Sequence, residues 1–414
     1  MASSSSNTNC TVINDTNGTD TIIIDAIGNG SIGGGGSIGG GGSIGGGGSI
    51  GGGGSIGGGG SIAGGGSIGG GSIAGGGSIG GGGSIGGGSI GGGSHGGSEK
   101  KYIVLCHDAT TDFGRRIQDL DPGRFKFCNI RWNKFPDGTD DITIEGFIPI
   151  NLIGNQHILF FASFHNNDVA LSQLSVLIVL LQSFTKSLTI VLPFFPVGTM
   201  ERVEEEGQVA TANTFCMLLS NLPSIGISKR IMIYDIHTLQ NRFYFSGSMA
   251  PSLHSGIGLL IPKLLKERID TICFPDDGAA KRFSKKFDKD KFEVIICGKI
   301  RDGEKRIVRI QDGNPLGKRV VIVDDMVQSG GTLYECALEL QKQGALSICA
   351  FTTHAVFPKE AWKNFSKKEN GSKAIFGTFW VTNSNITVTS SLPSDDVFVV
   401  LDLLPQIVSD LDFK

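Results

Sequence analysis

Two adjacent carboxylates and the glycine turn behind them are the residues of this chain whose types and spacing point most directly to chemistry. Asp324 and Asp325 follow the apolar run at 320–323, and a small-residue turn comes next. Glycine lets a backbone approach a ligand closely, and the first N–H groups of a helix have no partner inside that helix. Because the helix dipole also makes that end positive, a phosphate is predicted to bind the turn of Gln328, Ser329, Gly330, Gly331 and Thr332.

The two acids are expected to serve a different part of the same ligand, because carboxylates repel a phosphate. Vicinal hydroxyls of a ribose, or a bound Mg²⁺, suit that role. The implied ligand is a sugar phosphate with its phosphate in the turn and its hydroxyls on Asp324 and Asp325. The alternative is an ordinary strand-to-helix joint with two solvated acids, but the adjacent acids followed by QSGGT favour the ligand site.

The elements that must position this turn form a predicted βαβ unit. The β-branched residues at 320–323 are typical of a strand buried on both faces. Residues 347–357 are predicted to form the next strand. Between them, apolar residues recur at helical spacing until Gly344, namely Leu333, Cys336, Ala337 and Leu340.

At these residues the chain resembles a known family. The segment VVIVDDMVQSGGT is similar to the phosphoribosyl-diphosphate-binding signature of type I phosphoribosyltransferases, and the sequence from about residue 101 onward resembles the ribose-phosphate diphosphokinases, in particular their divergent plant branch. The resemblance implies an α/β protein with two phosphoribosyltransferase-like domains, each a mostly parallel sheet flanked by helices. We expect these domains at 101–245 and 246–414, the second carrying the ribose 5-phosphate loop.

The resemblance also implies an activity. Members of that family transfer the diphosphoryl group of ATP to the 1-hydroxyl of ribose 5-phosphate and require Mg²⁺. ATP and ribose 5-phosphate are therefore the expected partners, and a homo-oligomer is the expected assembly. A non-catalytic regulatory subunit of the same fold is one alternative, and a phosphoribosyltransferase that acts on a purine or pyrimidine base is another.

Further site residues are carried over from the family by position. Phe135 and Asp137, in the turn FPDG, match residues of an adenine pocket that often belongs to a neighbouring subunit, although Thr139 stands where the family has a second acid. Arg202 matches one residue of the family's nucleotide clamp, whose other residues differ here. The expected metal-binding residues follow two other strands, and they are His237, with Asp235 in support, and Asp276.

A cation-rich segment follows the predicted strand at 292–297. Transfer of a diphosphoryl group concentrates negative charge, so cations must lie over it while water is excluded. Lys299 and Arg301 match the Lys-x-Arg pair of the family's catalytic flexible loop and are the predicted catalytic residues. The alternative is a charged surface hairpin with no role in catalysis.

Composition limits the other possibilities. The chain has 414 residues and a net charge of −3, which gives no electrostatic case for nucleic acid or an anionic membrane. Its 8 cysteines are scattered without a C-x-x-C pair, so neither a zinc site nor a disulfide framework is indicated. A reducing, cytoplasmic location is the expectation. The apolar stretch 169–185 is predicted to be a buried helix, with a subunit contact as a further role for it.

The first 98 residues form a separate region. From about residue 28 they repeat GGGGSI and close variants, and no Lys or Arg precedes Lys100, so neither a secretory signal nor a transit peptide is expected. Glycine loses the most backbone entropy on ordering, and one Ile per repeat offsets little of it. A disordered low-complexity tail is therefore predicted, with a periodic glycine-rich sheet as the alternative.

Overall fold

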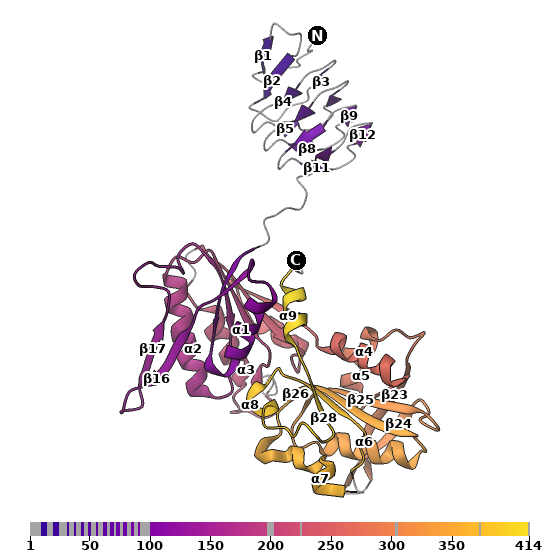
Figure 1. Cartoon of the computed structure of the whole chain (residues 1–414). Helices are drawn as coiled ribbons and strands as arrows, with labels where there is room; N and C mark the ends of the chain where they lie inside the picture. The colour runs from indigo at the N-terminus through magenta and orange to yellow at the C-terminus, as the bar shows by residue number, and fades with distance from the viewer. Residues whose placement is uncertain are drawn as a thin grey trace. The chain divides into compact units, whose positions relative to one another are not determined.

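The computed structural model describes residues 100–196, 203–223, 226–302, 305–371 and 374–412, together with short strands between residues 10 and 91. Side chains are described over the same ranges, except at 299–307. The chain divides into two compact units, Met1–Lys100 and Lys101–Lys414 (Figure 1).

The first unit consists of short strands centred on the Ser-Ile pairs of the repeat. Strand β1 (Cys10–Asn14) pairs antiparallel with β2 (Asp20–Ile24). The later strands pair in parallel with the strand three repeats away, so that Ile38 is in register with Ile56. These strands form three sheets. One continues from β2 through β4 (Ser37–Ile38), β7 (Ser55–Ile56), β10 (Ser72–Ala74) and β13 (Ile90–Gly91), and the second contains β3 (Ser31–Ile32), β6 (Ser49–Ile50), β9 (Ser67–Gly69) and β12 (Ser84–Gly86). The third contains β5 (Ser43–Ile44), β8 (Ser61–Ala63) and β11 (Ser78–Gly80).

The short strands follow the period of the repeat, as in the periodic glycine-rich sheet named as the alternative, and the disordered low-complexity tail at 1–98 stays a prediction. Regular spacing is the physical reason for the periodic strands, because each Ser-Ile pair meets an identical pair at a fixed interval and the backbone hydrogen bonds repeat along the stack.

The second unit begins with a parallel sheet in the order β15-β14-β18-β19-β20-β21. Its central strands β14, β18 and β19 are apolar and buried, as a sheet covered on both faces requires. The strands are β14 (Tyr102–Cys106), β15 (Phe125–Phe127), β18 (His157–Phe161), β19 (Ser187–Leu192), β20 (Ser228–Tyr234) and β21 (Met249–His254). The helices along this part of the chain are α1 (Thr111–Leu120), α2 (Asn167–Gln182) and α3 (Thr211–Ser220), and a separate hairpin is formed by β16 (Ile130–Lys134) and β17 (Asp140–Ile144).

The second sheet has the order β24-β23-β22-β25-β26-β27-β28, and its described pairs are parallel except for the β23–β24 hairpin. Its strands are β22 (Thr271–Phe274), β23 (Glu293–Asp302), β24 (Lys305–Asp312), β25 (Arg319–Val327), β26 (Ser347–Ala355), β27 (Phe379–Thr382) and β28 (Phe398–Leu401). The helices of this half are α4 (Ile257–Glu267), α5 (Asp277–Phe283), α6 (Gly331–Lys342), α7 (Lys367–Asn370), α8 (Ile386–Thr389) and α9 (Leu404–Leu411).

The predicted α/β architecture with two mostly parallel sheets is confirmed, but the chain crosses between them more than once. Strand β21 pairs with β20 in the first sheet, although the predicted boundary at residue 245 assigned it to the second domain. Helix α9 also returns to the first half, where Leu404 and Ile407 share a core with Val104. The hydroxyl of Tyr234 donates to Asp410 of α9 at 2.9 Å. The first sheet therefore depends on both ends of the 101–414 unit.

Helix α2 matches the apolar stretch predicted to be buried. One face is buried, with Leu177 and Leu180 at 0% exposure, while Leu171 on another face is 66% exposed. A subunit contact at that exposed face stays a prediction. Among the described residues, no helix combines the length and the apolar character needed to span a membrane.

Candidate active site

A cavity of about 730 Å³ lies where the two halves of the second unit meet. Its walls come from the segment after β20, from the start of α5, and from the joint between β25 and α6. All three follow the C-terminal end of a parallel strand, which is where ligands bind in open α/β sheets. The lining residues named in the sequence analysis are His237, Asp276, Asp324, Asp325, Gln328, Ser329, Gly330, Gly331 and Thr332.

The turn at 328–332 has the conformation that its glycines suggest. Gly330 has a φ of 78° and lies directly before α6, and none of the described side chains caps that helix. A Cβ atom at Gly330 would lie 2.0 Å from Cζ of Phe365, so a side chain there would force the Phe365 ring to move. The unpaired N–H groups at the start of α6 therefore face a glycine turn that lines the cavity, an arrangement suited to an anion.

The two adjacent acids have different environments. The N–H of Asp325 donates to the carboxylate of Asp324 at 2.9 Å. Burial and the negative charges of Asp325 and Asp276 hold the pKa of Asp324 well above its ordinary range. Burial would also raise the pKa of Asp325, but the hydrogen bond from His237 and the positive charge of Arg282 outweigh it and lower the pKa to about 2. The pair thus combines a firmly ionised carboxylate with one that resists ionisation.

Arg282 is a site residue that sequence reasoning missed. Its Nη1 donates to the carbonyl of His237 at 2.8 Å and to Oδ2 of Asp325 at 3.2 Å. Its buried Nη2 has no hydrogen-bond partner within the part of the chain that the structure describes. The guanidinium thereby joins the end of β20, the helix α5 and the strand β25. The sequence feature that could have indicated Arg282 is its position in the helix that follows PDDG. An Arg in a helix is ordinarily taken to be solvent-exposed, so this position was not enough to identify it.

The two predicted metal-binding acids outside β25 lie in contrasting places. Asp276 lines the cavity and caps α5 by accepting from the N–H of Ala279 at 2.9 Å. Asp235 is only 3% exposed, and its Oδ2 accepts from the N–H of Gly256 at 2.8 Å and from the hydroxyl of Thr353 at 2.6 Å. Asp235 is therefore placed to hold the end of β20, which leads to His237, and does not line the cavity itself.

Mg²⁺ suits the residues that line this cavity. Mg²⁺ is usually bound by one or two carboxylates together with substrate phosphates and water. Asp276 and Asp324 both line the cavity, and the charge of Asp276 contributes to the raised pKa of Asp324. A cation between two carboxylates relieves that kind of repulsion. Asp276 and His237, which both line this cavity, are the residues that would hold it, near the carboxylate of Asp324.

The predicted catalytic cations lie in the β23–β24 hairpin. In that hairpin Lys299 is in register with Val308, and Arg301 with Arg306. The backbone is therefore a paired ribbon at the edge of the second sheet, and the side chains of Lys299 and Arg301 lie outside the described ones. Arg202, predicted to contact the nucleotide, also lies outside the described residues.

The predicted adenine-pocket residues are not brought to the cavity. Phe135 and Asp137 occupy the tip of the β16–β17 hairpin, which Figure 1 shows on the side of the unit away from α5 and β25. Phe135 is 51% exposed, and Asp137 accepts from the hydroxyl of Thr139 at 2.7 Å. Thr139, which stands where the family has an acid, thus fixes the conformation of the turn.

The fold and the cavity define a protein of the phosphoribosyltransferase type. Residues 277–381 match the family model described as "Phosphoribosyl transferase domain". The fold also resembles that of phosphoribosylpyrophosphate synthetase from Mycobacterium smegmatis, with a TM-score of 0.59 at 19% identity, over 75% of this chain and 98% of that one.

Comparison with curated proteins identifies the family more narrowly. The chain is 44% identical over 288 residues to ribose-phosphate pyrophosphokinase 4 of Arabidopsis thaliana, covering 68% of this chain and 84% of that protein. It is 45% identical over 289 residues to the enzyme of the same name from Oryza sativa, covering 68% and 87%. A mitochondrial ribose-phosphate pyrophosphokinase 3 of Spinacia oleracea is 42% identical over 292 residues, covering 68% and 70%.

The chain therefore belongs to the family of ribose-phosphate pyrophosphokinases. This confirms the resemblance carried by VVIVDDMVQSGGT and its flanks, and with it the expectation of an enzyme. One relative is named chloroplastic and another mitochondrial, so the cytoplasmic location expected from composition stays a prediction.

Proposed function

We propose that this chain transfers the β,γ-diphosphoryl group of ATP to the 1-hydroxyl of ribose 5-phosphate, giving phosphoribosyl diphosphate and AMP. The observation that carries the proposal is the coincidence of two features in one cavity. The uncapped start of α6 behind Gly330 suits a phosphate, and the Asp324–Asp325 pair suits a sugar. Membership in the ribose-phosphate pyrophosphokinase family supports the same assignment.

The sugar phosphate is assigned to the joint between β25 and α6. Its phosphate accepts hydrogen bonds from the N–H groups of the turn at 328–332, assisted by the hydroxyls of Ser329 and Thr332. Its ring hydroxyls donate to Asp324 and Asp325. Because Oδ2 of Asp325 already accepts from Arg282 and contacts His237, that carboxylate is held in place before the sugar arrives.

The diphosphoryl transfer itself is an in-line displacement. The 1-hydroxyl oxygen attacks the β-phosphorus, and its proton is released to solvent. The bond from that phosphorus to the oxygen bridging it to the α-phosphorus breaks, and AMP leaves with the bridging oxygen. Mg²⁺, when bound, neutralises phosphate charge and aligns the nucleotide, and we assign His237 and Asp276 to its site, with Asp235 positioning the strand end. Lys299 and Arg301 stabilise the charge that develops on the transferred group.

The assembly proposed is a homo-oligomer in which the β16–β17 hairpin serves a neighbouring subunit. Neither Phe135 nor Asp137 lines the cavity of its own chain, and Figure 1 shows their hairpin away from α5 and β25. Phe135 is exposed, as a stacking surface for a base must be. Arg202 is assigned to the same nucleotide.

The test is direct. Purified protein incubated with ATP, Mg²⁺ and ribose 5-phosphate is expected to form AMP and phosphoribosyl diphosphate in equal amounts, as measured by chromatography. Calorimetric binding of ribose 5-phosphate without any AMP would instead support the regulatory subunit. Diphosphate released from phosphoribosyl diphosphate on addition of a purine or pyrimidine base would support the base-transferring enzyme.

A further inference from the structure

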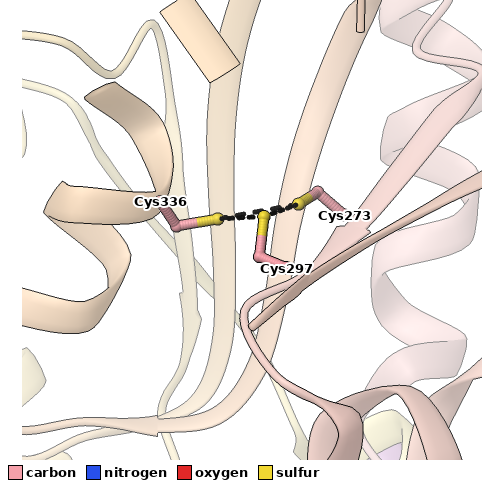
Figure 2. A group of neighbouring side chains, drawn as sticks. All are labelled: Cys273, Cys297 and Cys336. Atoms are coloured by element: carbon pink, nitrogen blue, oxygen red, sulfur yellow. Dashed lines mark hydrogen bonds between the residues drawn. The ribbon is translucent and has the colours of Figure 1, made fainter. Parts of the chain in front are cut away.

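Three cysteines that are far apart in the sequence meet in the second sheet. Cys273 lies on β22, Cys297 on β23 and Cys336 on α6, and all three side chains are buried. Figure 2 shows their sulfur atoms pointing toward one another. The Sγ–Sγ distances are 3.7 Å for Cys273 to Cys297, 3.6 Å for Cys273 to Cys336 and 3.4 Å for Cys297 to Cys336.

We propose that the sulfur atoms of Cys273, Cys297 and Cys336 form a binding site for a thiophilic d¹⁰ metal ion, with Zn²⁺ as the physiological candidate. Among the His, Cys, Asp and Glu side chains that the structure describes, these three cysteines form a group whose donor atoms all lie within 4.8 Å of one another. Zinc sites with cysteine ligands are tetrahedral, with Zn–S bonds of about 2.3 Å.

The size of the sulfur triangle fits such an ion. A triangle with sides of 3.4, 3.6 and 3.7 Å has its centre about 2.1 Å from each sulfur. An ion displaced from that plane by about 1 Å therefore has three Zn–S bonds of ordinary length. This is one face of a tetrahedron, whose fourth corner remains for another donor.

A buried acid beside the cluster already has a partner. Glu339 lies one helical turn beyond Cys336 on α6 and is 6% exposed, and its carboxylate is paired with Arg309 at 2.9 Å. Binding of Zn²⁺ to the three thiolates, with loss of three thiol protons, leaves a complex of charge −1.

The site connects the elements that carry the proposed active site. Strand β22 leads to Asp276, β23 continues to Lys299 and Arg301, and α6 begins at the phosphate turn. A metal ion bonded to all three would fix their relative positions. It would also stabilise the folded chain, because the site does not exist in the unfolded chain and the binding free energy therefore adds to that of folding. The metal site itself does not depend on the proposed reaction.

The experiment measures metal bound to the full-length protein. Protein purified from zinc-supplemented cells is expected to contain about one Zn²⁺ per chain by inductively coupled plasma mass spectrometry. Cys336→Ala should lower that content at least tenfold. The matched control is Cys349→Ala, which removes a buried cysteine of β26 outside the cluster and should retain the metal.

A second measurement on the wild-type chain covers the case in which Cys336→Ala fails to fold. After chelation and refolding with Co²⁺, thiolate-to-cobalt charge-transfer absorption is expected, and bound metal should slow alkylation of these three cysteines specifically. Wild-type protein with neither zinc nor a cobalt band would overturn the proposal and leave the three cysteines as packed core residues. Equal zinc in the Cys336→Ala and Cys349→Ala variants would also overturn it, because the metal would then lie elsewhere.

Discussion

The Nδ1 atom of His237 lies 2.7 Å from the Oδ2 atom of Asp325, although the two residues are 88 positions apart. His237 follows a strand of the first sheet, and Asp325 lies in a strand of the second. Arg282 also donates to this carboxylate, at 3.2 Å. The contact therefore joins the two halves of the 101–414 unit at the cavity.

Asp325→Asn is expected to weaken the acid dependence of stability. Because the folded pKa of Asp325 is lowered to about 2, its stabilisation is complete above the ordinary carboxyl pKa and is lost as the pH falls toward 2. The wild-type protein should lose about 2 kcal/mol of unfolding free energy from this group over that window, and the variant should lose correspondingly less. Urea titrations between neutral and acidic pH measure the difference.

The control is Asp290→Asn, which changes an exposed carboxylate of the same domain. It should leave the acid dependence of stability as it is in the wild type. An Asp325→Asn protein whose stability follows the wild-type pH profile would mean that His237 and Arg282 do not stabilise the ionised carboxylate in solution.

Asp324→Asn is expected to raise the stability of the protein at neutral pH. The folded pKa of Asp324 is raised, so the fold disfavours its ionised form, and stability is lost as the pH rises above the ordinary carboxyl pKa. In Mg²⁺-free buffer at neutral pH, the neutral Asn should raise the thermal midpoint by several degrees while activity falls sharply. Differential scanning calorimetry checks this, and a lowered midpoint would contradict it.

Gly330→Ala is expected to cost stability and ribose 5-phosphate binding together. The substitution combines a φ of 78° with a Cβ 2.0 Å from the ring of Phe365, and should cost about 3 kcal/mol or more. Gly317→Ala is the matched control, since its φ is 71° but nothing lies within 4 Å of the added carbon, and it should cost about 1 kcal/mol. Chemical denaturation and calorimetry of sugar binding measure both effects, and equal costs in the two variants would show that Phe365 moves aside.

Lys299→Ala is expected to lower kcat by two orders of magnitude or more, because a cation that stabilises the transferred diphosphoryl group would be missing. Ribose 5-phosphate affinity should remain near that of the wild type. Lys291→Ala, which removes an exposed lysine ion-paired with Asp288 before β23, is the control and should keep full activity. Steady-state kinetics and calorimetry separate the effects, and wild-type turnover in Lys299→Ala would remove the hairpin from the mechanism.

Deletion of residues 1–98 is expected to leave activity and thermal stability nearly unchanged. Residues 101–414 form their own compact unit, with its own buried cores. Activity assays and thermal denaturation of the shortened chain measure this. Aggregation or loss of turnover on truncation would show that the repeat region contributes to the folded enzyme.

The local parts of this protein were predictable from sequence. The strand, the two acids, the glycine turn and the helix around Gly330 are contiguous, so their pattern follows from backbone preferences and side-chain periodicity alone. The same holds for the strand and helix that flank Asp276. Their boundaries differed from expectation by a few residues, as in β25, which continues to Val327 because its last residues still pair with β26.

Contacts between distant segments were decided only by the tertiary structure. The strand order places β22 between β23 and β25, so Cys273, Cys297 and Cys336 converge although no sequence spacing relates them, and composition had argued against zinc. Arg282 likewise became a site residue only when α5 packed beside the end of β20. Parallel strands are joined by long crossovers, so neighbours in the sheet are not neighbours in the chain, and side chains at one sheet edge meet only after folding.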